Sequence, residues 1–317
     1  MGAMTSEVAD QLVEDDPEAI IASCTDDWFC QERALEHVRA VVAQSGTSFG
    51  PGMAILSGGQ RDAMHAIYAF CREVDDIADD FDATAEDRQE RLRLWREEID
   101  KLYEDGPNWL TTLALLEPIY SFELPQAEFI GMIDGMVMDA TNQMMAPSHK
   151  DLSLYTRRVA GTVGLLSMRV FSPNDGSPDE AHDQFALDLA DAFQLTNILR
   201  DIAEDGSRGR LYLPREMLAA HDVPVPDNEE ALLETLEHPN LGKVCEELAQ
   251  QAGKLFEGCE AMLPTLDKRA IRPALVMWSV YGRYLQDMGR RGWRDPLATL
   301  RYSKARKLWL AMQGLLR

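Results

Sequence analysis

Along most of the chain, apolar residues recur at three- and four-residue steps, the spacing that places them on one face of a helix. No segment shows the sustained alternation of apolar and polar residues that is typical of a half-buried strand. Glycine and proline, which end helices, gather between the periodic segments. The pattern predicts an all-α fold with helices over residues 26–43, 60–80, 84–104, 108–118, 125–141, 149–171, 179–204, 241–262, 267–292 and 303–315.

The first part of the chain differs from the rest in composition. Residues 1–25 are rich in Asp and Glu, so we expect a disordered N-terminal segment there. Residues 26–317 contain no linker, internal repeat or low-complexity tract, and a chain of 317 residues can bury a sizeable core. We expect this part to form one helical domain.

The composition excludes several classes of protein. The formal net charge of −23 argues against nucleic acid as a partner, because phosphate backbones require a basic surface, and also against direct attraction to anionic lipid. No uncharged apolar run approaches the ~20 residues of a membrane helix, and the N-terminus does not resemble a signal peptide. The five cysteines form no CxxC pair, which argues against a disulfide framework or a zinc site. These features predict a cytoplasmic protein.

The stretch QLTNILRDIAED, residues 194–205, places a row of oxygen-bearing side chains on an otherwise apolar helix. Asn197, Asp201 and Asp205 stand at i, i+4 and i+8, so their side chains lie above one another on one face. Like charges at this spacing repel each other unless a cation lies between them. The row is therefore a candidate half of a cation site.

A second row lies in IYAFCREVDDIADD, residues 67–80, where Tyr68, Arg72, either Asp75 or Asp76, and Asp79 recur at three- and four-residue steps. A solvated face held by salt bridges explains either row alone equally well. Two such rows favour a cation site, and Mg²⁺ fits because it prefers oxygen ligands and binds through carboxylates together with substrate phosphates. Two acidic rows bridged by Mg²⁺ could hold a diphosphate beside an apolar cavity and neutralise its charge as it departs.

Three motifs carry a resemblance to a known family. They are YAFCREVDDIADD at 68–80, LYTRRVAGTVG at 154–164 and QLTNILRDIAEDGSRGRLYLP at 194–214. Together they resemble the squalene/phytoene synthase family of head-to-head prenyltransferases, from about Ser45 to Leu315. Within the family, segments 92–106 and 131–139 and the C-terminal region look most like the bacterial enzymes of hopanoid biosynthesis. The resemblance implies a single-domain helical isoprenoid synthase fold around a central cavity.

The resemblance also implies roles for individual residues. The Mg²⁺ ligands would be Asp75 and Asp79 on one helix and Asn197, Asp201 and Asp205 on the other. Diphosphate contacts would come from Arg72, Gln194 and Arg200. The flexible flap over the site would contain Ser48 and Phe49, and the tyrosines lining the site would be Tyr68, Tyr155 and Tyr281.

The implied reaction is the condensation of two farnesyl diphosphates to presqualene diphosphate, with release of diphosphate. An allylic cation from the donor would be attacked by the 2,3 double bond of the acceptor, and proton loss would close a cyclopropane. The implied proton acceptor is Tyr68, Tyr155 or the released diphosphate, and the sequence leaves all three open. An enzyme of this kind is a Mg²⁺-dependent prenyltransferase with farnesyl diphosphate as its substrate.

Other functions fit parts of the same pattern. Phytoene or dehydrosqualene synthesis shares the first half-reaction, whereas squalene synthesis also needs NADPH, for which the chain shows no GxGxxG motif. A non-catalytic helical partner protein with a relic site is disfavoured by the complete set of candidate metal ligands. A lipophilic product would favour transient association with the membrane surface, peripheral to the inner membrane, and handover to a downstream squalene-forming enzyme.

Overall fold

The computed structural model describes residues 27–45, 47, 49–104, 106–172 and 179–315. Ser48 and the predicted N-terminal segment 1–25 lie outside these residues. The all-α prediction is confirmed, because the described residues contain helices and one isolated bridge between Met145 and Leu211, with no strand. No described helix is both long enough and apolar enough to cross a membrane.

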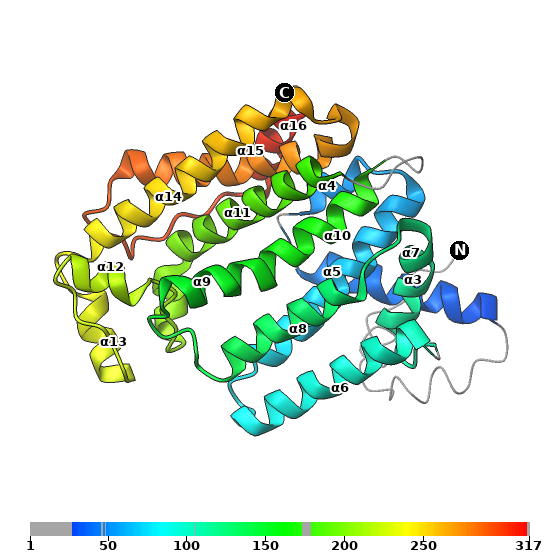
Figure 1. The fold of residues 1–317 in the computed structure, drawn as a ribbon, viewed down its shortest axis with the longest axis horizontal. Helices are drawn as coiled ribbons and strands as arrows, with labels where there is room; N and C mark the ends of the chain where they lie inside the picture. Colours follow the sequence, from blue (N-terminus) through cyan, green and yellow to red (C-terminus); the bar gives the residue numbers. More distant parts are fainter. Residues whose placement is uncertain (1–26, 46, 48, 105, 173–178, 316–317) are drawn as a thin grey trace.

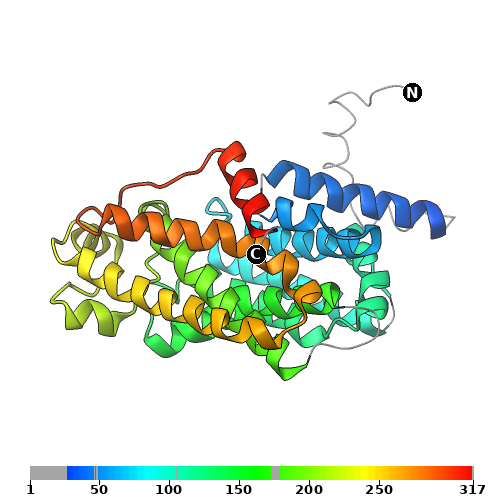
Figure 2. The same ribbon diagram turned by 90° about the horizontal axis from the view of Figure 1, so that it is seen from above.

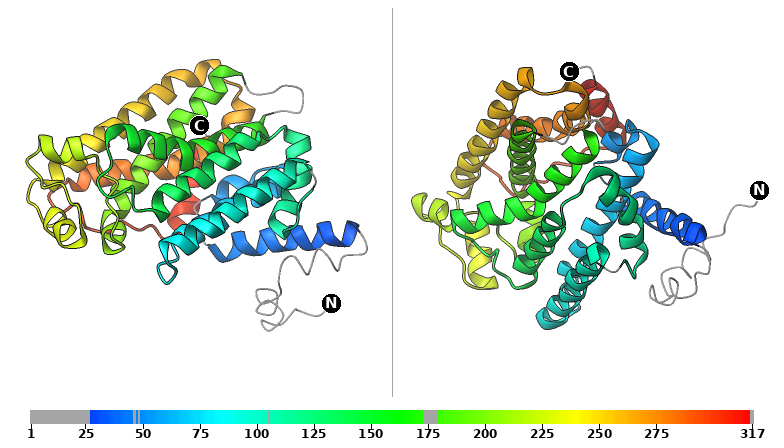
Figure 3. Two further views of the ribbon diagram at one scale, coloured as in Figure 1. Left: turned by 60° about the horizontal axis from the view of Figure 1, so that its bottom comes forward. Right: turned by 45° about the vertical axis from the view of Figure 1, so that its right-hand side comes forward.

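The α-helices form one bundle, in which neighbouring helices run side by side (Figures 1 and 3). Their bounds are α3 Asp27–Ser45, α4 Gly50–Ala54, α5 Gly58–Ala78, α6 Ala85–Glu104, α7 Leu110–Phe122, α8 Gln126–Ala140, α9 His149–Thr156, α10 Thr162–Phe171, α11 Glu180–Ser207, α12 Arg215–Ala220, α13 Glu229–Leu236, α14 Leu241–Met262, α15 Lys268–Arg291 and α16 Lys304–Gly314.

The short helices differ most from the prediction. The periodicity did not indicate α4, α12 or α13, which have five, six and eight residues. The predicted helix 149–171 is interrupted by a π-helical turn, Arg157–Gly161, where the amide of Thr162 donates to the carbonyl of Arg157. This turn separates α9 from α10.

The two helices that carry the acidic rows have defined starting points. Ser57 precedes α5, and its hydroxyl donates to Oε1 of Gln60 at 2.8 Å. Nε2 of Gln60 in turn donates to the carbonyl of Val170 at 2.7 Å, which fixes α5 against α10. Asp179 caps α11 by accepting from the amide of His182 at 3.0 Å. These contacts set the helix registers and thereby the faces on which the acidic rows lie.

Glycine allows α10 to approach its neighbours closely. A Cβ added at Gly164 would lie 2.8 Å from the carbonyl oxygen of Ala186 on α11, and one added at Gly161, the last residue of the π-helical turn before α10, would lie 3.1 Å from a methyl carbon of Leu187. A side chain at Gly164 would therefore push α10 away from α11. The wall that the two helices form together requires this close approach.

One cysteine differs from the expectation. Cys30 takes part in a disulfide, whereas Cys71, Cys245 and Cys259 are free thiols. The odd number of cysteines and the lack of a CxxC pair gave no indication of this bridge at the start of α3.

Candidate active site

A cavity of about 260 Å³ lies between α5, α10, α11 and α15, with α4 closing one side. Most of its wall is apolar, and methionine contributes at several points, including Met53, Met64, Met132, Met168 and Met277. Methionine suits such a wall because its unbranched side chain adapts to irregular space. At the polar end lie Tyr68, Arg72, Asp75, Gln194 and Asn197, which come from the two acidic rows.

The α5 row leads from the cavity to the end of the helix. Nε of Arg72 donates to Asp76 at 3.0 Å, and its Nη1 lies 3.5 Å from Asp75. Burial, together with the charge of Asp79, raises the pKa of Asp75 to about 7. Asp79 follows the last residue of α5, where the helix dipole also disfavours a negative charge. This end of α5 therefore favours a bound cation.

The α11 row has a similar electrostatic character. Oδ1 of Asn197 is buried without a hydrogen-bond partner, and Asp201 accepts from Nε of Arg200 at 2.8 Å. Burial, together with the charge of Asp201, raises the pKa of Asp205 to about 7. An unpaired amide oxygen and a carboxyl group with a raised pKa are both features that a metal ion would stabilise.

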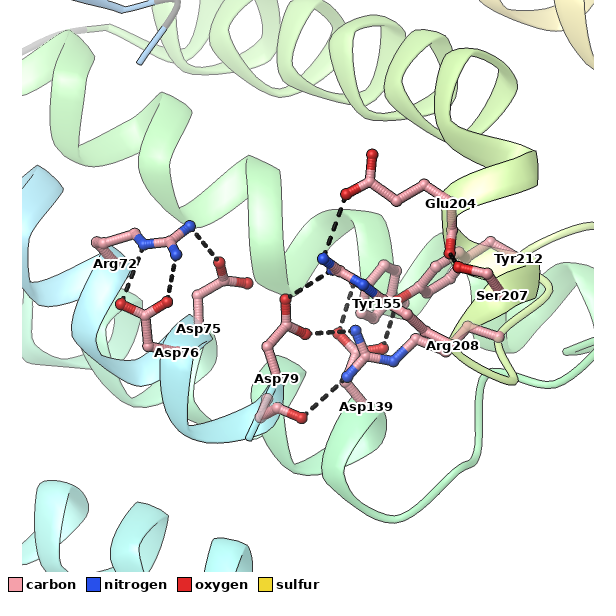
Figure 4. Close-up of polar contacts among 12 residues, drawn as sticks. Arg72, Asp75, Asp76, Asp79, Asp139, Tyr155, Glu204, Ser207, Arg208 and Tyr212 are labelled. Carbon is pink, nitrogen blue, oxygen red and sulfur yellow. Dashed lines mark hydrogen bonds and ion pairs between the residues drawn. The ribbon is translucent and has the colours of Figure 1, made fainter. Parts of the chain in front are cut away.

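Arginine side chains join the two rows. Arg208 lies 3.2 Å from Asp79, directly after α5, and 3.2 Å from Glu204 of α11, so it connects the end of one helix to the other (Figure 4). Arg210 also pairs with Asp79, and its Nη2 donates to the carbonyl of Ala78 at 2.9 Å. Two segments more than a hundred residues apart in the chain are thereby brought to one site.

The oxygen donors fit a divalent cation, although they are not gathered around one point. Among the described residues, no three His, Cys, Asp or Glu side chains converge closely enough to hold a metal ion. Guanidinium groups neutralise Asp79 and Asp201 instead. Burial, and next the charges of Asp79 and Asp201, nevertheless raise the pKa values of Asp75 and Asp205. The donor set of carboxylate and amide oxygens is the kind that Mg²⁺ binds.

A buried carboxylate that sequence reasoning missed lies between the rows. Asp139, at the end of α8, accepts hydrogen bonds from the hydroxyls of Tyr155 and Tyr212, each at 2.8 Å, and these two rings stack 5.1 Å apart (Figure 4). Burial raises the pKa of Asp139 to about 6, against the opposing effect of Arg210 and the two hydroxyls. A single Asp in the apolar sequence GMVMDA was the signal that could have revealed it.

The structure places the predicted site residues in three groups. Those that line the cavity are Phe49, Tyr68, Arg72, Asp75, Gln194, Asn197 and Tyr281. Those that lie outside the lining are Asp79, directly after α5, and Arg200, Asp201 and Asp205 on α11. Tyr155 does not line the cavity, because its hydroxyl is directed to Asp139. Burial raises its pKa well above the usual value of 10.

Comparison with known proteins gives consistent matches over most of the chain. Residues 42–306 match the family model described as squalene/phytoene synthase. A presqualene diphosphate synthase of Zymomonas mobilis is 38% identical over 284 residues, which are 89% of this chain and 94% of that protein. A 15-cis-phytoene synthase of Synechococcus elongatus is 34% identical over 225 residues, 68% of this chain and 70% of that protein.

A solved structure confirms the likeness of the fold. The crystal structure of a dehydrosqualene synthase in complex with a ligand superposes with a TM-score of 0.75 at 25% identity. The alignment covers 91% of this chain and 98% of that one. The helical fold is thus shared with that dehydrosqualene synthase.

Proposed function

Because the chain belongs to the squalene/phytoene synthase family, we propose that it condenses two molecules of farnesyl diphosphate head to head, forming presqualene diphosphate. The observation that carries this proposal is the apolar cavity whose polar end is formed by two acidic helices. The relative named presqualene diphosphate synthase, similar over nearly its whole length, favours this product over others. We also propose that residues 26–317 act as one catalytic domain.

Five side chains are proposed to hold Mg²⁺ at the polar end of the cavity. Asp75 and Asp79 would bind from α5, and the α11 ligands would be Asn197, Asp201 and Asp205. The unpartnered Oδ1 of Asn197 supports this set, since a buried amide oxygen without a donor is costly. When bound, the ions would neutralise the diphosphate charge and so improve diphosphate as a leaving group.

The remaining site residues would bind the substrate and shield the allylic cation formed from it. Arg72 and Gln194 line the polar end, where they would contact diphosphate oxygens, with Arg200 beyond them. Ser48 is proposed to belong with Phe49 to the segment that closes over the substrate. Phe49, Tyr68 and Tyr281 present aromatic rings to the cavity, which would exclude water and stabilise an allylic cation.

The proposed reaction joins C1 of one farnesyl diphosphate, the donor, to the 2,3 double bond of a second one, the acceptor. The bond between C1 of the donor and its diphosphate oxygen breaks, and the 2,3 double bond of the acceptor attacks C1. Loss of a proton from the same C1 then closes the cyclopropane ring. Of the two candidate tyrosines, Tyr68 lines the cavity and is better placed than Tyr155 to receive this proton. The released diphosphate is the alternative acceptor.

Product analysis tests the proposal. Incubation with farnesyl diphosphate and Mg²⁺ should accumulate a C30 cyclopropylcarbinyl diphosphate with release of one diphosphate per turnover, and NADPH should change nothing. If squalene formed when NADPH was added, the protein would be a squalene synthase instead. Faster formation of a C40 product from geranylgeranyl diphosphate would assign phytoene synthesis, which the similarity to a phytoene synthase keeps as the second candidate.

The metal-free protein should lose stability as the pH rises from about 4 to about 7, because Asp75 and Asp205 bind protons more tightly in the folded protein than in the unfolded one. Bound Mg²⁺ would neutralise the same two carboxylates that these protons neutralise. The increase in melting temperature caused by MgCl₂ should therefore be larger at about pH 8 than at about pH 5. Scanning fluorimetry measures both, with NaCl at matched ionic strength as the control. An equal increase at the two pH values would contradict the assigned ligands.

The cellular context follows from the product. Presqualene diphosphate combines a long apolar part with a charged group, so its next enzyme would receive it most readily at a membrane surface. We therefore propose a cytoplasmic protein that is peripheral to the inner membrane and hands its product to a squalene-forming enzyme.

A further inference from the structure

Basic residues are concentrated near the C-terminus of this acidic chain. Residues 290–307 contain seven Lys and Arg residues and one acidic residue, Asp295, although the whole chain has a formal net charge of −23. Three of the seven are ion-paired, Arg290 and Arg306 with Asp287 and Arg301 with Glu204. Arg294 and Lys304 are exposed and form no ion pair within the described part of the chain, so they leave local positive charge on an acidic protein.

The same region exposes an apolar helix face. Leu308, Trp309 and Met312 of α16 are 55%, 52% and 50% exposed. With Ala305 they follow the i, i+3, i+4, i+7 spacing of one helix face. Such a face normally lies against a protein core, whereas here it lies in solvent.

The inner face of α16 is firmly packed, so the exposed face is not a consequence of poor docking. Leu310, Ala311 and Gly314 are buried. Oγ of Ser279 donates to the carbonyl of Leu310 at 2.7 Å, and a Cβ added at Gly314 would lie 2.8 Å from the carbonyl oxygen of Leu275. The bundle thus holds α16 with its second apolar face outward.

The exposed face lies next to the cavity wall. α16 packs against α15 and α4, and both of these helices line the cavity, through Met277 and Met53 among others. Figure 2 shows α16 at the outer edge of the molecule, at the end of the segment that returns from α15. A surface bound by α16 would therefore lie close to two of the helices that line the cavity.

We propose that the outer face of α16, together with the exposed Lys304 at its first position and Arg294 in the segment before it, docks on an anionic lipid bilayer. The apolar side chains would enter the headgroup boundary while the basic side chains contact lipid phosphates, and tryptophan is favoured at this depth. Three half-exposed side chains are too few for a stable protein interface, which needs on the order of 1,000 Å². The use of this surface for product delivery rests on the proposed function, but the docking does not.

Vesicle sedimentation of the full chain without substrate tests the proposal. The wild type should bind vesicles that contain phosphatidylglycerol, more weakly at high salt, and should bind pure phosphatidylcholine vesicles poorly. Leu308→Gln combined with Trp309→Gln should lower the partition coefficient on the order of tenfold. Lys304→Glu combined with Arg294→Glu should weaken binding to the anionic vesicles alone.

Leu233→Gln is the matched control, because Leu233 on α13 is a leucine of similar exposure, at 61%, in another part of the bundle. It should bind vesicles like the wild type. Unchanged binding of the Leu308 and Trp309 variant would overturn the proposal. So would a concentration-dependent dimer of the wild type that this variant abolishes. Diphosphate release without lipid is measured separately and should be unchanged in the variant, which separates this proposal from the proposed reaction.

Discussion

Asp75→Asn and Asp201→Asn should each lower the turnover of farnesyl diphosphate by about 10³-fold, with little change in the fold. Each substitution removes one negative charge from the proposed Mg²⁺ ligands while keeping the size of the side chain. Metal stabilisation of a leaving diphosphate is worth several kcal/mol, and about 4 kcal/mol corresponds to this factor. Release of diphosphate at saturating Mg²⁺ is the measurement.

The two variants should differ in stability. The raised pKa of Asp75 means that the fold disfavours its charged form, so Asp75→Asn should stabilise the metal-free protein at about pH 8 by about 1 kcal/mol, after allowance for the partial exposure of the side chain. Asp201→Asn should not stabilise the protein, because Asp201 is paired with Arg200. Urea unfolding without metal distinguishes the two outcomes.

Matched controls lie on the same two helices. Asp62 on α5 pairs with Arg39, and Asp188 on α11 accepts from Gln184, both outside the cavity lining. Asp62→Asn and Asp188→Asn should keep the turnover of the wild type. If Asp75→Asn or Asp201→Asn did so as well, the assignment of the metal ligands would be wrong.

Asp139→Ala should lower the free energy of unfolding by about 3 kcal/mol, because it removes the acceptor of two tyrosine hydroxyls and the negative charge near the buried Arg210. Turnover should fall as well, since Arg210 pairs with Asp79 at the candidate metal site. Denaturant unfolding measures the first effect, and diphosphate release by the folded protein measures the second.

Two smaller changes in the same cluster separate the effect of charge from that of hydrogen bonding. Tyr155→Phe removes one hydroxyl and should cost about 1 kcal/mol. Asp139→Asn keeps an acceptor oxygen and should lower stability less than Asp139→Ala does. A loss in Asp139→Ala no larger than that in Tyr155→Phe would show that the buried carboxylate does not organise this cluster.

The helices could be predicted largely from periodicity, because long helices repeat their apolar face many times. Helix α4 has only five residues and presents two glycines and a proline, so it shows no periodic face. The π-helical turn could not be foreseen either, since one additional residue within a long apolar pattern leaves no clear mark on the sequence. Both features line the cavity, through Met53 and Val159, so the least predictable segments contribute to the candidate site.

For the site itself, spacing within one helix was enough to find both acidic rows. Their partners come from elsewhere in the chain, and no spacing rule reveals them: Arg208 reaches Asp79 across 129 residues. Tyr155 illustrates the limit, because its motif fixed its place on a helix but not the direction of its hydroxyl. The buried Asp139, which contacts it, determines that direction.

The ion pairs of Arg208 and Arg210 with Asp79 would make the binding of a metal ion at the proposed site an exchange of counter-ions. A cation bound to Asp79 would displace guanidinium groups, and the loss of those ion pairs would weaken its affinity when it binds alone. The displaced guanidinium groups would become available to an anion. Thermodynamic reciprocity then requires that a diphosphate tighten the binding of the metal by the same factor by which the metal tightens the binding of the diphosphate. The metal ion and the anionic substrate would thus bind cooperatively. The metal ion would replace the guanidinium groups at Asp79, and the substrate would replace Asp79 at the guanidinium groups.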